Sequence, residues 1–280
     1  MVAVGAVESA LKDVAVEVAR EAADLVRKAR NAMVAGERVR VETKTSETDV
    51  VTAVDRASEE LIRRRLAELR PGEAVLGEEG GGVAPAASVE GDADPVTWVV
   101  DPIDGTVNFL YGSPVFAVSV AAQISGASVA GAVVEPISGR CWTASRGDGA
   151  WLDGRRLRVS APERLDLALV GTGFAYLAER RSRQARMIAG LLDRVRDVRR
   201  PGSGALDLCS VAAGWTDGYL EHGLHRWDWA AGALIAAEAG AVVSLPGRDP
   251  ELGPDATFAA APTIAGPLRE AFISCGAGEI

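Results

Sequence analysis

Hydrophobic residues recur every three or four positions near the start of the chain, with charged residues between them. The apolar positions of this segment are Val7, Leu11, Val14, Val18, Leu25 and Val26. This spacing predicts an amphipathic helix over residues 7–30. A second helical pattern covers residues 58–69, and Pro71 and Gly72 end it because neither residue readily continues a helix.

The middle of the chain changes to short runs rich in β-branched and small apolar residues, a pattern typical of strands. These runs cover residues 115–123, 128–135, 140–145, 150–152 and 157–160. Turns such as Gly147-Asp148-Gly149 and Asp153-Gly154 separate them. The pattern therefore predicts an antiparallel sheet in this part of the chain.

Helical and strand patterns alternate in the remainder of the chain. Strands are expected at residues 167–171, 218–221, 241–245 and 257–261, and helices at residues 177–195, 203–213, 227–239 and 264–274. Helices and sheets in both parts predict an α/β protein of stacked layers. We expect two parts that form one compact unit, residues 1–161 and residues 162–280.

An apolar run that begins at Trp98 ends in a short polar turn. The run is typical of a buried strand, and we expect it to stop at Pro102, which cannot continue a sheet ladder. Gly105 permits a sharp turn, and Thr106 is expected to cap a following helix. The N–H groups of a helix start suit phosphate, so this turn is a candidate phosphate site.

Four acidic residues occupy the ends of such elements, and hard cations prefer their oxygen ligands. Asp101 and Asp104 flank the turn, Glu78 follows a short strand predicted at residues 74–77, and Asp228 opens the helical pattern of residues 227–239. Each of these acids also has an alternative role that involves no cation. Asp228 suits a helix start, Glu78 suits a solvated loop, and Asp101 and Asp104 suit a turn with a helix cap. Their joint occurrence favours a metal-dependent site for a phosphate ester.

Composition limits the alternatives. The chain has 280 residues, 48% of them hydrophobic and 25% charged, and a net charge of −9, which disfavours non-specific binding to nucleic acid or to an acidic membrane. We find no apolar run long enough to span a bilayer and no signal-peptide layout. The three cysteines are widely spaced, so we expect reduced thiols in a cytoplasmic protein.

Three motifs in this order resemble those of the inositol monophosphatase family. They are Gly77-Glu78-Glu79, residues 98–106 with Asn108-Phe109, and the run Trp-Asp-Trp-Ala-Ala-Gly at residues 227–232. The resemblance extends over about residues 44–261. It implies an αβαβα sandwich, with an antiparallel sheet in the N-terminal part and a mixed sheet in the C-terminal part. It also implies a magnesium-dependent, lithium-sensitive phosphatase that is commonly a homodimer.

The resemblance implies a set of cation ligands. Glu78, Asp101 and the carbonyl of Ile103 would hold one Mg²⁺, and Asp101, Asp104 and Asp228 a second, while Glu78 would help to hold a third. Mg²⁺ takes few carboxylates and keeps several waters, which suits this set.

The family pattern also assigns the reaction. Thr106 and Asp55 would orient the water that attacks phosphorus directly, without a phospho-enzyme, although Asp55 would equally suit a helix cap. Glu78 would take part in catalysis as a ligand of the cation. Phosphate or substrate contacts are implied for Lys44, Asp104, Gly105, Thr106, Gly202, Ser203, Gly204, Glu221 and Asp228.

The expected substrate is a small polyol monophosphate, with myo-inositol 1-phosphate as first choice, because a carboxylate such as Glu221 can accept from two vicinal hydroxyls. Gly204 and Leu220 depart from the residues common in inositol-type members. Histidinol phosphate, fructose 1,6-bisphosphate or a 3′-phosphonucleotide is the alternative, as is an accessory factor that binds other proteins. We expect structural roles for His222 and His225.

Overall fold

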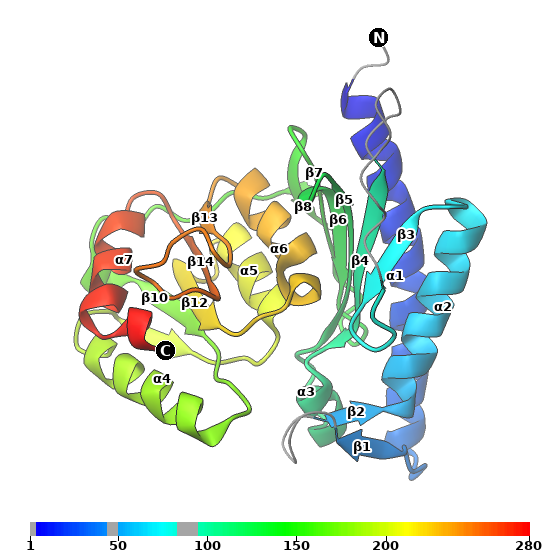
Figure 1. Ribbon diagram of the computed structural model, residues 1–280, viewed down its shortest axis with the longest axis horizontal. Helices are drawn as coiled ribbons and strands as arrows, with labels where there is room; N and C mark the ends of the chain where they lie inside the picture. Colours follow the sequence, from blue (N-terminus) through cyan, green and yellow to red (C-terminus); the bar gives the residue numbers. More distant parts are fainter. Residues whose placement is uncertain (1–3, 44–49, 83–94) are drawn as a thin grey trace.

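The computed structural model describes residues 4–43, 50–82 and 95–280, and within them five layers stack in the order αβαβα (Figure 1). The outer layer on one side is formed by α1 (Val4–Val34) and α2 (Ala53–Leu69), and the middle layer by α5 (Gly204–Ala212) and α6 (Arg226–Glu238). The far layer is formed by α4 (Ala178–Leu191) and α7 (Ala265–Ser274). Two sheets separate these helical layers, so the predicted sandwich is confirmed.

The larger sheet holds seven strands among the described residues, in chain order from β3 to β9. They are β3 (Ala74–Gly77), β4 (Val96–Asp104), β5 (Ala117–Ile124), β6 (Ala127–Val134), β7 (Cys141–Ser145), β8 (Gly149–Leu152) and β9 (Arg155–Arg156). All neighbours are antiparallel except β3 and β4, which are parallel. The strand predicted at residues 157–160 is wrong, because the chain leaves the sheet after Arg156.

Strand β4 does not stop at Pro102 but continues to Asp104, so this expectation is wrong. Asp101 pairs with Ser119 and Asp104 with Ala117, which leaves two residues of β4 opposite one residue of β5. Such a bulge needs no ladder hydrogen bond from the proline, whose ring nitrogen carries no hydrogen.

Helix α3 (Thr106–Tyr111) follows this bulge directly. The residue at its N-cap is Gly105, with a left-handed φ of 100°, and Thr106 is the first helical residue. The prediction that Thr106 caps the helix is therefore wrong, and its hydroxyl is available for a different contact.

A two-stranded ladder, β1 (Val41–Thr43) and β2 (Val50–Thr52), precedes α2 and was not predicted. Helix α2 begins at Ala53, five residues before the predicted start at residue 58, because Thr52 and Asp55 form a capping box there. This reciprocal cap lies ahead of the apolar positions from which the helix was predicted.

The smaller sheet has five strands among the described residues, in the order β11-β10-β12-β14-β13. They are β10 (Leu169–Thr172), β11 (Asp197–Arg199), β12 (Gly218–His222), β13 (Val242–Ser244) and β14 (Ala256–Ala260). Strand β10 is parallel to β11 and β12, while β14 is antiparallel to β12 and β13, so this sheet is mixed as predicted. Short 3-10 turns, η1 (Leu165–Leu167) and η2 (Ala277–Glu279), complete the fold.

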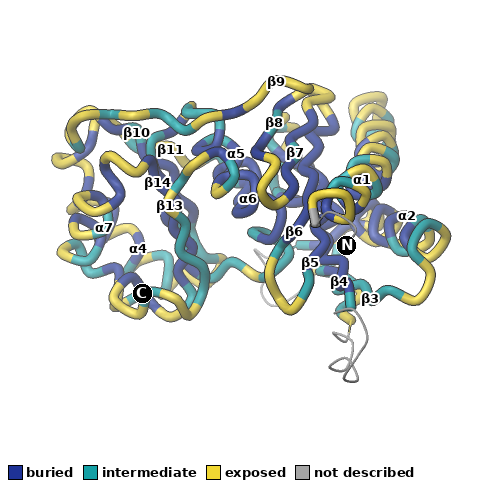
Figure 2. The backbone as a smooth tube through the Cα atoms, turned by 90° about the horizontal axis from the view of Figure 1, so that it is seen from above, coloured by how far each residue is buried: buried dark blue, intermediate teal, exposed yellow. Residues whose placement is uncertain are grey.

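The middle helical layer packs closely on both sheets, and buried residues line its contacts (Figure 2). A Cβ at Gly131 of β6 would lie 3.1 Å from the Cα of Ala231, so α6 approaches the larger sheet almost to backbone contact. This approach brings the start of α6 beside the end of β4. No helix among the described residues is both long and apolar enough to cross a membrane.

Candidate active site

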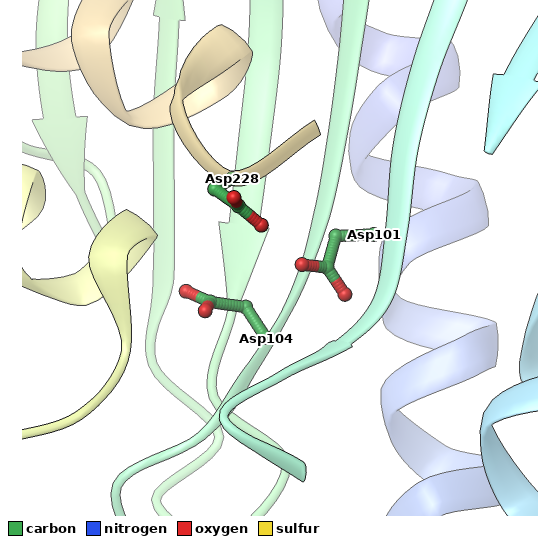
Figure 3. Close-up of side chains that lie close together, drawn as sticks. All are labelled: Asp101, Asp104 and Asp228. Atoms are coloured by element: carbon green, nitrogen blue, oxygen red, sulfur yellow. The ribbon is translucent and has the colours of Figure 1, made fainter. Parts of the chain in front are cut away.

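Three aspartates from distant parts of the chain meet between the two sheets. Asp101 and Asp104 come from β4, and Asp228 from the first turn of α6 (Figure 3). One carboxylate oxygen from each residue lies within 4.8 Å of the other two. The sequence expectation that these residues converge is met by the geometry.

The bulge at Pro102 explains why two residues of one strand can share this site. Residues three apart in a regular strand point to opposite faces of the sheet. The extra residue between Asp101 and Asp104 resets this alternation and turns both side chains toward α6. The amide of Ile103 donates to Asp101 Oδ1 at 3.0 Å and closes the turn.

Burial makes these carboxylates unusual acids. Asp101 is 1% exposed and Asp104 8% exposed. Burial, followed by the charge of Glu78 and of Asp104, raises the pKa of Asp101 well above its ordinary value. Burial also raises the pKa of Asp228, with Asp104 as the next cause. A cation among these oxygens would offset both the lost hydration and the mutual repulsion.

Asp104 differs from Asp101 and Asp228 because hydrogen bonds hold it to residues 203–205 at the start of α5. It accepts from the Ser203 hydroxyl at 2.6 Å, from the Ala205 amide at 2.7 Å and from the Gly204 amide at 3.3 Å. Burial raises its pKa to about 6, although these three bonds lower it. Ser203 also caps α5 by accepting from the amide of Leu206.

Glu78 follows β3 and lines the same cavity, although it lies outside the tight group of three aspartates. Among the neighbouring charges, Glu78 has the largest raising effect on the pKa of Asp101. The Ile103 carbonyl lies 3.1 Å from the Thr106 hydroxyl. Thus Glu78 and Ile103 both border the aspartate group, and their role as cation ligands stays a prediction.

Thr106 and Asp55 form a buried pair beside this group. The Thr106 hydroxyl donates to Asp55 Oδ1 at 2.9 Å, while Asp55 Oδ2 accepts from the Thr52 amide at 2.9 Å and from the Thr52 hydroxyl. Asp55 therefore completes the capping box of α2 and also binds Thr106, while the orientation of a water by this pair stays a prediction.

A cavity of about 400 Å³ opens over these residues. Its lining includes most positions singled out from the sequence, namely Glu78, Asp101, Ile103, Asp104, Gly105, Thr106, Gly202, Gly204, Glu221 and Asp228. Lys44 lies outside the described residues. Ser203 is turned toward Asp104, and Asp55 lies behind Thr106.

Glu221 of β12 lines the same cavity and accepts from the Tyr219 hydroxyl at 2.7 Å. Burial raises the pKa of Glu221 to about 7, against the lowering effects of Tyr219 and of Arg200. A Cβ at Gly173 would lie 1.9 Å from this carboxyl group. Gly173 was not singled out from the sequence, because the need for a glycine at this position arises only from its contact with Glu221 in the folded protein.

Other lining residues also escaped sequence reasoning because they come from the loop after β10 and from separate elements. They are Phe174, Ala175, Tyr176, Leu177, Arg180 and Arg200. Of the two histidines, His222 is buried and binds the carbonyl of Leu252 at 2.7 Å, while His225 stacks on Trp227 with 4.9 Å between ring centroids. Both histidines border the cavity.

The sequence model of the inositol monophosphatase family matches residues 8–274. The chain belongs to the inositol monophosphatase family. A Mycobacterium leprae protein named inositol-1-monophosphatase is 54% identical in an alignment of 272 positions, and the match covers 93% of this chain and 92% of that protein. Membership confirms the predicted phosphatase class and the sandwich fold, and this family is generally metal-dependent.

Solved structures and further relatives agree with this membership. The structure of Mycobacterium tuberculosis SuhB has a TM-score of 0.79 and 43% sequence identity, over 96% of this chain and 98% of that one. A Pseudomonas aeruginosa protein named Nus factor SuhB is 44% identical, over 70% of this chain and 72% of that protein. Members of the family thus carry two kinds of name, an enzymatic one and one for an accessory factor.

Proposed function

We propose that this chain hydrolyses myo-inositol 1-phosphate, or a closely similar polyol monophosphate, to the polyol and inorganic phosphate with the help of Mg²⁺. The observation that carries the proposal is the convergence of Asp101, Asp104 and Asp228 in a cavity that Glu221 also lines. A polyol monophosphate carries negative charge on its phosphate and hydroxyl groups on the rest of the molecule. The aspartates, with a bound cation, suit the phosphate, and Glu221 suits the hydroxyl groups.

The donor set fits Mg²⁺ because every ligand is an oxygen and because two of the three clustered aspartates, Asp101 and Asp104, are buried. Glu78, Asp101 and the Ile103 carbonyl would hold one ion, and Asp101, Asp104 and Asp228 another, with Glu78 assisting a third. Bound Mg²⁺ supplies positive charge against the phosphate and the departing alkoxide and lowers the pKa of the attacking water.

Thr106 is suited to orient that water. Its hydroxyl hydrogen is directed at Asp55, so the lone pairs of its oxygen remain to accept from a water in the cavity. The water oxygen bonds to phosphorus and the ester P–O bond breaks. The water gives up one proton and the alkoxide takes up one, so the products are the free polyol and hydrogen phosphate. The amides of Gly105 and Thr106, together with Lys44, would hold the phosphate oxygens.

Glu221 is suited to recognise the polyol. Its ionised form can accept from two neighbouring hydroxyls, and the Tyr219 hydroxyl fixes its orientation. Gly202 and Gly204 line the cavity without side chains and allow a sugar ring to approach the backbone, and Ser203 supports Asp104 between them.

The test is phosphate release from four candidate substrates: myo-inositol 1-phosphate, histidinol phosphate, fructose 1,6-bisphosphate and 3′-phosphoadenosine 5′-phosphate. We expect the highest kcat/KM for the inositol ester, with loss of activity in EDTA and recovery on addition of Mg²⁺. Preference for another ester would reject the substrate assignment, and release that survives EDTA would reject the metal assignment. Lithium should inhibit by occupying a Mg²⁺ position.

A second candidate function is an accessory role through binding of another protein, favoured by the P. aeruginosa relative named Nus factor SuhB. We propose that such a role, where present, is independent of hydrolysis and that the protein is a cytoplasmic homodimer without nucleic-acid or membrane binding of its own. Asp104→Asn should then abolish hydrolysis and leave the mass in solution and the protein-binding activity unchanged. Parallel loss of both would contradict this independence.

A further inference from the structure

The turn that carries Glu78 is held from outside by helix α2. Glu59 of this helix is 2% exposed, and its two carboxylate oxygens accept from consecutive amides of the turn. The Glu79 amide lies 2.7 Å from Oε2, and the Gly80 amide lies 2.8 Å from Oε1. A buried carboxylate that accepts from two backbone amides fixes their positions strongly, because these bonds are charge-assisted.

Arg63, one helical turn further along α2, completes the attachment. Its Nε donates to Glu59 Oε1 at 2.7 Å, Nη1 donates to the Val75 carbonyl at 3.2 Å, and Nη2 donates to the Gly81 carbonyl at 2.5 Å. The guanidinium therefore joins Glu59 to both arms of the turn, and the Gly77 amide closes the turn on the Gly81 carbonyl at 3.0 Å.

The glycines of the turn show how closely it packs on Glu59. A Cβ at Gly77 would lie 2.4 Å from Glu59 Oε1, and a Cβ at Gly80 would lie 2.7 Å from the same atom. Neither glycine has a positive φ, so the requirement at these positions is for space rather than for backbone conformation. Any side chain here would push the turn away from α2.

We propose that Glu59, supported by Arg63, is a positioning residue for the cation site. Glu78 stands between Gly77, which leaves no room for a Cβ beside the Glu59 carboxylate, and Glu79, whose amide donates to that carboxylate. Displacement of that backbone moves Glu78 relative to Asp101, its partner across the site. The inference rests on the proposed metal-dependent function and extends it to residues that touch neither cation nor substrate.

The test is Glu59→Gln, which keeps the shape of the side chain but replaces one acceptor oxygen with an NH₂ group that faces a backbone N–H. We expect about tenfold weaker binding of Mn²⁺, measured by electron paramagnetic resonance on the full chain, and a matching rise in the Mg²⁺ concentration for half-maximal activity. The kcat at saturating Mg²⁺ should stay near that of the wild type, because the reacting groups are unchanged.

The matched control is Glu68→Gln on the same helix, since Glu68 is exposed and pairs with Arg65 away from the turn. It should bind Mn²⁺ as the wild type does. Arg63→Lys is the second variant, because Arg63 is partly exposed and the substitution keeps its charge while removing the fork that reaches Val75 and Gly81. Arg63→Lys should also weaken Mn²⁺ binding, by a smaller factor than Glu59→Gln. If Glu59→Gln does not fold, Arg63→Lys alone tests the positioning role.

Wild-type affinity for Mn²⁺ in a folded Glu59→Gln or Arg63→Lys variant would overturn the inference, even if the melting temperature falls, since that is the result of a purely structural role. In that case the proposed function stands. If the wild-type protein itself binds no divalent cation, the proposed function and this inference are both wrong.

Discussion

Two parts of the cavity lining contain acids, and the surroundings of these acids differ. We call them the β4 end, with Asp101, Asp104 and Asp228, and the β12 end, with Glu221. At the β4 end, Asp101 and Asp228 face other carboxylates, and their neighbours raise their pKa further. At the β12 end, Glu221 is held by the neutral hydroxyl of Tyr219, and burial is the main cause of its raised pKa, with a smaller contribution from Asp104. Acids that raise one another's pKa call for a cation, whereas an acid oriented by a hydroxyl is suited to the hydroxyl groups of a ligand.

The largest effect should come from removing a charge at the β4 end. Asp101→Asn should lower Mg²⁺-dependent kcat/KM by about a thousandfold, since several kcal/mol of transition-state stabilisation would be lost. The melting temperature of the metal-free variant should rise, because a buried repulsion disappears. Phosphate release and thermal unfolding in EDTA measure the two effects.

Asp166→Asn is the matched control for this change, because Asp166 is exposed and pairs only locally with Arg164. It should leave both quantities unchanged. Full Mg²⁺-dependent turnover in Asp101→Asn would contradict the assignment of cation binding to the β4 end of the cavity.

Thr106→Val should have the next largest effect, about a hundredfold on kcat with little change in KM, because it removes the hydroxyl that binds Asp55 without changing the size of the side chain. Steady-state kinetics at saturating Mg²⁺ separate the two parameters. Exposed Thr263→Val serves as the control. A rise in KM alone would assign Thr106 to substrate binding instead.

Changes at the β12 end should act on KM. Glu221→Gln should raise the KM for myo-inositol 1-phosphate about tenfold and leave kcat nearly unchanged, the loss expected for one charged hydrogen-bond acceptor. Because the pKa of Glu221 is raised to about 7, the ionised acceptor disappears as pH falls through that value. The wild-type KM should therefore rise below about pH 7, and the KM of Glu221→Gln should stay flat.

Gly173→Ala tests the same contact from the opposite side, because its Cβ would displace the Glu221 carboxyl group. We expect a rise in KM in the same direction as for Glu221→Gln. Gly266→Ala is the control, since a Cβ there meets nothing within 4 Å. An unchanged KM in both Gly173→Ala and Glu221→Gln would contradict polyol recognition at this end.

The smallest effect is on stability. Asp104 has a folded pKa raised to about 6, so its ionisation destabilises the metal-free protein increasingly as pH rises from about 4 to above 6. Mg²⁺ binds the ionised form and should raise the melting temperature by about 5 °C at pH 8, at roughly a hundred times Kd, and by less at pH 5.5. Equal shifts at both pH values in scanning calorimetry would contradict this linkage.

The acids at the β4 end could be found in the sequence because their placement is local. Asp101, Pro102 and Asp104 lie in one segment, and the bulge that aligns the two aspartates is made by the same residues. The exact course of the strand could not be predicted, because a bulge depends on the register with β5. Asp228 was detectable for a similar reason, since it opens a strongly apolar helix.

The supporting residues could not be found in this way. Glu59 and Arg63 lie in a charged stretch of α2 that is typical of a solvated helix face, and only the fold brings them to the turn after β3. Strands β1, β2 and β11 are three residues long and pair with partners that their own patterns do not specify. Tertiary contacts, rather than local preference, determine these features.

The three hydrogen bonds from residues 203–205 to Asp104 have a consequence for how such enzymes diverge over evolutionary time. A mutation that remodels the start of α5 to suit a new ligand would also disturb a reactive carboxylate, so selection would remove it. Residues 174–177, in the loop after β10, border the cavity but make none of these bonds to Asp104, so they are free of this conflict. New ligand preferences should therefore arise in that loop while the reaction itself is inherited unchanged.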